Sequence, residues 1–166
     1  MTELRATIGV SGLTRLGQRA VARSMYAKGH GFLGAAVLLR RQGGYESVVL
    51  HLLCQGLEIV LKAALLFKDF DLFHSQLRRP LGHNLELIVQ TAASTFGLHP
   101  MRPALAEEIQ RLSNRYEQHL LRYGTIYDVF VDPSTIPSEL LLKRTAAMLR
   151  LMRRQLPELG AAETTV

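Results

Sequence analysis

The sequence predicts an all-α protein with five helices in one compact domain. Glycine and proline residues divide the chain into five segments in which apolar residues recur at intervals of three and four, the spacing of one helix face. No segment shows the alternation of Val, Ile or Thr with polar residues that a half-buried strand needs. The 166 residues are 48% hydrophobic and 20% charged, a composition typical of a folded domain rather than a disordered chain.

The first two predicted helices form an antiparallel hairpin. The first runs from about residue 14 to residue 42, either as one helix or as two pieces divided at the weak point Gly29-His30-Gly31. Gly43-Gly44 ends it, and the second helix runs from Tyr45 to residue 67 or 69. A turn this short between two helices indicates neighbours that run in opposite directions.

The second helix is apolar enough to suggest a membrane span. Glu58 and Lys62 interrupt its apolar run, and each would cost roughly 2.5–3.5 kcal/mol at the centre of a bilayer. We therefore expect a buried helix of a soluble bundle and no contact with a membrane.

Three further helices are predicted in the second half of the chain. The third begins at the cap His83-Asn84 and ends before Gly97, and the fourth runs from Pro103 to about residue 123. A loop over residues 124–136 precedes Pro137, which begins the fifth helix, and this helix reaches about residue 155. The predicted organisation is an N-terminal arm (1–13), one bundle (14–157) and a flexible tail (158–166).

Cysteine content and the N-terminus indicate a cytoplasmic protein. Cys54 is the one cysteine, so the chain forms no internal disulfide and no multi-thiolate metal site. The first residues lack the apolar core of a secretory signal. We expect no metal and no cofactor.

The net charge of +6 is unevenly distributed. Residues 1–41 carry +6, residues 42–137 carry −2 and residues 138–166 carry +2. Clustered cations attract phosphates by releasing counterions, so this asymmetry favours an anionic partner. In the alternative interpretation, the sixteen arginines and four lysines reflect genomic base composition and a solvated helix face.

Four polar residues form one narrow line along the apolar second helix. His51, Gln55, Glu58 and Lys62 are four, three and four residues apart, which places them within about 60° of one another around the helix. One interpretation is a buried Glu58–Lys62 ion pair that fixes helix register, and the other is a functional site in a cleft. A metal held by His51 and Glu58 is disfavoured because their spacing is not that of helical ligand pairs.

The fourth helix carries a basic face with the same spacing. It is formed by Arg111, Arg115, Gln118 and Arg122, with His119 beside them. Guanidinium groups suit phosphate, so this face is a candidate anion site, with a solvated surface as the alternative.

Four segments in order resemble the HEPN (higher eukaryotes and prokaryotes nucleotide-binding) family. They are FLGAAVLLRRQGGYES at 32–47, VVLHLLCQGLEIVLKAALL at 48–66, GHNLELI at 82–88 and NRYEQHLLRYG at 114–124. The family features that match are Glu58/Lys62, Gly82/His83 and Tyr116/Arg122/Tyr123, and the resemblance covers about residues 20–155.

The resemblance implies a fold and a set of functions. The fold is an up-and-down bundle of four to five helices, often a homodimer with a cleft between protomers. The functions are binding of RNA or a nucleotide, RNA cleavage, and association with a nucleotidyltransferase-like or antitoxin partner in toxin–antitoxin or defence systems. The ligand-binding candidates are Arg111, Arg115, Arg122, Lys62, Glu58 and His83.

The chain departs from the catalytic pattern of the family. Catalytic members carry an Arg, four to six residues and a His on the late helix, but no histidine follows Arg122 here. The pairs Arg78/His83 and Arg23/His30 fit the spacing only in other segments. The leading hypothesis is therefore a non-catalytic binding module. The alternatives are a metal-independent ribonuclease that uses Arg122/His119 or Lys62/His83, and a structural assembly subunit.

Overall fold

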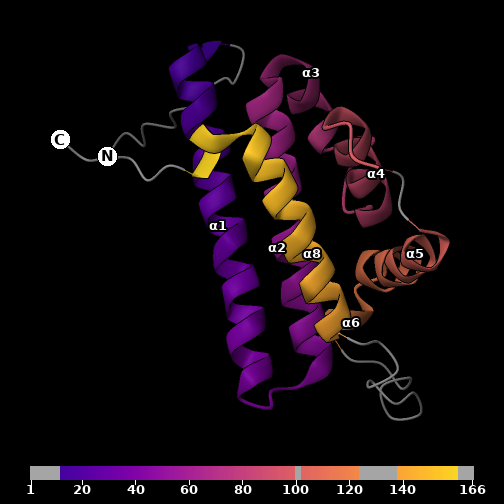
Figure 1. Cartoon of the computed structure of the whole chain (residues 1–166). Coiled ribbons are helices and arrows are strands. Elements are labelled where there is room, and N and C mark those ends of the chain that lie inside the picture. The colour runs from indigo at the N-terminus through magenta and orange to yellow at the C-terminus, as the bar shows by residue number, and fades with distance from the viewer. Residues whose placement is uncertain (1–11, 100–101, 124–137, 161–166) are drawn as a thin grey trace, which may run out of the picture.

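The computed structural model describes residues 12–99, 102–123 and 138–160, and no strand occurs among them. The all-α class predicted from the sequence is confirmed for this part of the chain (Figure 1). The helices are α1 (Arg15–Arg41), α2 (Glu46–Lys68), α3 (Phe70–His74), α4 (Leu85–Thr95), α5 (Pro103–Glu117), α6 (Leu120–Tyr123) and α8 (Ser138–Gln155), with the 3₁₀ turns η2 (Ser75–Leu77) and η4 (Pro157–Gly160).

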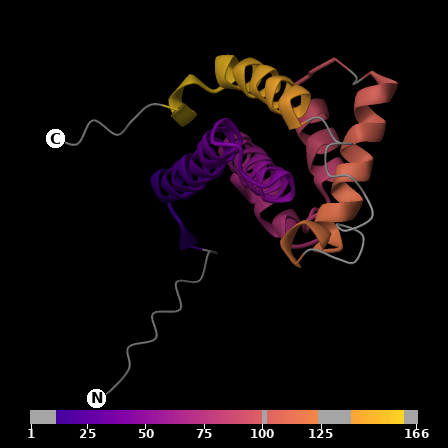
Figure 2. The same cartoon turned by 90° about the horizontal axis from the view of Figure 1, so that it is seen from below.

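Helix α2 lies at the centre of the fold. Figures 1 and 2 show α1 on one side of it, α4 and α5 on the other, and α8 across a third face. Among the described helices α2 alone is long and apolar enough to cross a membrane, yet 72% of its most apolar window is buried inside the fold. Its apolar side chains contact α1, α4, α5 and α8. A helix that is hydrophobic on nearly every face is buried in this way, because neighbouring helices cover each of its faces.

Helix α1 is one continuous helix, so the alternative of two pieces is wrong. Gly29 lies in its middle, where α1 and α2 approach each other closely. A Cβ on Gly29 would lie 2.9 Å from the Val60 backbone nitrogen, and one on Gly56 would lie 3.0 Å from the Gly29 carbonyl oxygen. The two glycines let the helix backbones touch, so their role is close packing rather than a break.

The chain after α2 differs from the predicted elements at two places. The short helix α3 and the turn η2 follow α2 where no element was predicted, because Asp69 begins a new helix by accepting a hydrogen bond from the Leu72 backbone. The fourth helix ends at Glu117 rather than near residue 123, because His119 adopts a positive φ of 58°. The predicted loop 124–136 and Pro137 lie outside the described residues.

The residues after α8 pack against α1. Leu159 is buried, and the Glu158 carboxylate lies 2.8 Å from the Arg19 guanidinium. The Arg23 side chain donates to the Glu158 carbonyl. Residues 157–160 therefore form a turn packed at the start of α1, whereas the sequence predicts a flexible tail from residue 158 onward.

Candidate functional site

Glu58 and Lys62 form a buried ion pair on α2. Lys62 Nζ lies 2.8 Å from Glu58 Oε1, and only 9% of the lysine side chain and 6% of the glutamate side chain are exposed. Lys62 also donates to the Gly82 carbonyl. The polar line of α2 therefore faces the interior, and the ion pair predicted from the spacing is present.

Tyr116 of α5 meets the same carboxylate from the opposite side. Its hydroxyl donates to Glu58 Oε2 at 2.8 Å and lies 3.3 Å from Gln55 Oε1. The rings of His51 and Tyr116 are 5.8 Å apart between centroids. In the polar line of α2, Lys62 therefore contacts Glu58, while His51, Gln55 and Glu58 lie against Tyr116.

His83 joins this buried network to the surface. Its Nδ1 lies 3.2 Å from both Glu58 oxygens, while 60% of its side chain is exposed. A carboxylate accepts hydrogen bonds, so Nδ1 carries the proton and Nε2 is the ring nitrogen left for a ligand. The arrangement presents an imidazole to solvent with its orientation set from below by a buried anion.

The turn that carries His83 is itself held in place. Gly82 adopts a positive φ of 45°, and its carbonyl accepts from Lys62. Asn84 caps α4 as predicted, because its side chain accepts from the Leu87 backbone at 2.8 Å. The three consecutive residues thus have separate roles: Gly82 forms the turn, His83 presents the imidazole to solvent, and Asn84 caps α4.

Glu58 is ionised in the folded protein. Burial by itself raises the pKa of this carboxyl group. The hydrogen bond and charge of Lys62, with the hydrogen bonds of Tyr116 and His83, outweigh burial and hold the pKa of Glu58 below its usual value. The network therefore carries a fixed negative charge that one buried ammonium balances.

The predicted basic face of the fourth helix is not continuous, because α5 ends at Glu117. Arg111 is exposed and Arg115 is half-buried on α5, whose inward face is formed by residues such as Ser113 and Tyr116. The break after Glu117 separates these arginines from His119, which is exposed, and from Arg122, whose side chain lies outside what the structure describes. The structure thus brings together Glu58, Lys62 and His83 but does not join Arg111 and Arg115 to them.

Two features of the site were not anticipated. The role of Tyr116 as a partner of Glu58 was missed because 58 residues separate them, and Tyr116 fits equally well into the apolar stripe of its helix. The capture of the Gly82 carbonyl by Lys62 was also missed, since backbone acceptors leave no signal in a sequence.

Within the described part of the chain, no group of three or more His, Cys, Asp or Glu side chains could hold a metal ion. Cys54 is fully buried, and burial raises the pKa of its thiol, so it is not a reactive nucleophile.

No family model, curated protein or solved structure matches this chain.

Proposed function

We propose that this chain is a HEPN-like helical module of the cytoplasm that binds a phosphate-bearing ligand, RNA or a nucleotide, over the exposed imidazole of His83. One observation supports it above the others. Three of the four segments that carry the resemblance contribute to a single hydrogen-bond network, through Glu58 and Lys62, through Gly82 and His83, and through Tyr116. A network that holds one exposed imidazole in a fixed orientation is suited to presenting it to a ligand.

The neighbourhood of His83 favours an anionic ligand. Arg78 and Arg79 are exposed in the same connection between α3 and α4. Arg111 and Arg115 lie on α5, whose Ser113 hydroxyl accepts a hydrogen bond from the Glu86 backbone of α4. The structure does not join these two arginines to His83, and in this proposal they contact phosphates farther along an RNA. Guanidinium groups bind phosphate oxygens in bidentate fashion, and His83 donates a further hydrogen bond from Nε2 when its imidazole is protonated on both nitrogens.

RNA binding by the full chain tests the proposal. A fluorescent single-stranded RNA of twelve nucleotides and labelled ATP are titrated with protein at about 50 and 200 mM salt. We expect affinity to fall as salt rises, because each neutralised phosphate releases counterions. We also expect His83→Ala and Arg79→Gln each to weaken binding about tenfold. The matched control is His99→Ala, which removes another exposed histidine.

Two results would overturn the proposal. One is an affinity that does not change with salt, and the other is equal binding by the His83→Ala and His99→Ala variants. A protein that binds neither RNA nor ATP would favour the structural assembly subunit. The proposed homodimer is tested separately by sedimentation, and the proposed nucleotidyltransferase-like or antitoxin partner by co-purification of the neighbouring gene product.

Metal-independent RNA cleavage is the second candidate function, and the contact between Glu58 and His83 favours it. A carboxylate that holds one imidazole nitrogen while the other faces solvent is the arrangement that general base catalysis requires. Lys62 would act as a positioning residue, since its ammonium is buried on Glu58 and the Gly82 carbonyl.

Incubation of RNA with the protein in a chelator separates binding from cleavage. Our leading proposal expects intact RNA. Cleavage that His83→Ala abolishes and His119→Ala preserves would assign the reaction to the Glu58–His83 pair. Cleavage that depends on His119 and Arg122 instead would assign it to the alternative pair.

A further inference from the structure

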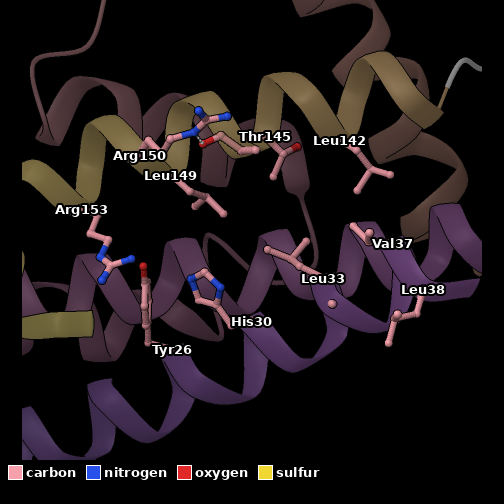
Figure 3. A pocket seen from close by; sticks show the side chains of 12 residues that line it. Tyr26, His30, Leu33, Val37, Leu38, Leu142, Thr145, Leu149, Arg150 and Arg153 are labelled. Atoms are coloured by element: carbon pink, nitrogen blue, oxygen red, sulfur yellow. Dashed lines mark hydrogen bonds between the residues drawn. The ribbon is translucent and has the colours of Figure 1, made fainter. Parts of the chain in front are cut away.

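A groove lies between α1 and α8, and His83 is not among the residues that line it. The two helices run antiparallel, since η4 packs at the start of α1 while Leu142 lies near its end. A pocket of about 550 Å³ lies between them, and Figure 3 shows side chains of both helices facing into it. A second pocket of about 470 Å³ shares Val37, Leu142 and Arg150 with the first and extends it toward Arg41.

The groove has the shape that receives another helix. Tyr26, His30, Leu33 and Val37 line it at spacings of four, three and four along α1, and Leu142, Thr145 and Leu149 line it at three and four along α8. Such stripes form the seam into which the side chains of a third helix insert. From Tyr26 to Arg41 the seam is about 22 Å long, so a helix of about four turns fills it.

The floor of the groove is apolar and uncharged. Leu33, Val37 and Leu149 form most of it. The rings of His30 and Tyr26 are 4.5 Å apart between centroids and tilted by 58°, and partial burial together with the charge of Arg153 lowers the pKa of His30. The ring is therefore neutral near pH 7, and the floor favours apolar side chains.

The rim of the groove is basic. Arg150 and Arg153 lie on the α8 side, and Arg40, Arg41 and Lys143 lie toward the far end. None of the described residues that line the two pockets is an Asp or a Glu. An occupant with acidic flanks would complement Arg41, Arg150 and Arg153.

We propose that this groove binds an acidic amphipathic helix of a partner protein. Such a helix inserts Leu, Ile or Val side chains between α1 and α8 and places Glu or Asp side chains against Arg150, Arg153 and Arg41. RNA fits less well, since phosphates would meet the cations but leave Leu33, Val37 and Leu149 under polar atoms. A second copy of this chain is disfavoured because two basic rims would face each other.

A designed peptide tests the groove directly. The probe is a fluorescent eighteen-residue helix with leucines at heptad a and d positions and glutamates on both flanks, and the control peptide has the same composition in scrambled order. We expect the full chain to bind the amphipathic probe at least tenfold more tightly than the scrambled peptide. We expect Arg150→Glu/Arg153→Glu and, separately, Val37→Gln to weaken probe binding about tenfold.

Matched variants and a competitor make the outcomes decisive. Arg15→Glu/Arg154→Glu changes the net charge equally with exposed residues that do not line the pockets, and it should leave probe affinity within about twofold. Circular dichroism checks that each variant folds. Equal binding of both peptides, or equal loss in both double variants, would overturn the proposal. Binding of a twelve-nucleotide RNA that is lost only in Arg150→Glu/Arg153→Glu, without probe binding, would assign the groove to nucleic acid. The two peptide outcomes do not depend on RNA binding at His83.

Discussion

Removal of the negative charge at Glu58 is the sharpest test of the buried network. Glu58→Gln keeps the side-chain shape and an oxygen for Tyr116, but it leaves the ammonium of Lys62, which is 9% exposed, without an anion. Removal of one partner of a buried ion pair costs about 3–5 kcal/mol. Lys62 still donates to the Gly82 carbonyl, so we expect a loss of about 3 kcal/mol in the free energy of unfolding.

Urea unfolding followed by circular dichroism measures this loss, with the slope checked for constancy. The control is Glu158→Gln, which breaks the Arg19–Glu158 pair, whose side chains are 54% and 57% exposed. Exposed pairs contribute about 0–1 kcal/mol, so the two variants should differ by about 2 kcal/mol or more. Glu58→Leu combined with Lys62→Met should lose less stability than Glu58→Gln, because no buried charge remains unpaired. Equal losses for Glu58→Gln and Glu158→Gln would refute the reasoning.

Three further outcomes follow from the structure. Gly29→Ala should destabilise the protein by about 1–3 kcal/mol, because the new Cβ meets the backbone of α2. Gly31→Ala, at a position with open space around it, should instead stabilise α1 by about 0.5–1 kcal/mol. Urea midpoints that shift in the same direction for both variants would contradict the close approach of the two helices. The pKa of Glu58 lies below its usual value of 4.5, so the ionised group stabilises the fold above that pH, and this contribution is lost as pH falls through the lower pKa of the folded state. The free energy of unfolding of Glu58→Gln should therefore fall less than that of the unchanged protein between about pH 6 and pH 3. Parallel curves of unfolding free energy against pH would count against the assignment. Cys54 should resist a thiol reagent in native buffer and react in urea, and rapid labelling of the native chain would show that the core opens there.

Local pattern was enough to predict most of the helices. The apolar periodicity of α2, the cap at Asn84 and the stop at Gly97, where φ is 59°, are decided by a few neighbouring residues, so the sequence alone predicts them. The orientation of Glu58 toward Lys62 also follows from helical spacing, because residues four apart share one face.

Local pattern failed where a distant contact or an unusual backbone angle decided the outcome. The sequence around Gly29 is typical of a helix break, but α1 continues through this residue. Gly29 is instead the point where Gly56 and Val60 of α2 pack directly against the backbone of α1. The fourth helix stops early because His119 takes a left-handed conformation that histidine seldom adopts and that no neighbouring glycine or proline signals.

The sequence by itself determined the all-α class, the buried acid–base pair on an apolar helix and the surplus of positive charge. Each of these depends on residue types and their spacing along one segment. Only the tertiary structure decided that Tyr116 and His83 converge on Glu58 and that α1 and α8 leave a basic groove between them. These features depend on how helices far apart in the chain pack, and that is set by shape complementarity across the whole core rather than by any local pattern.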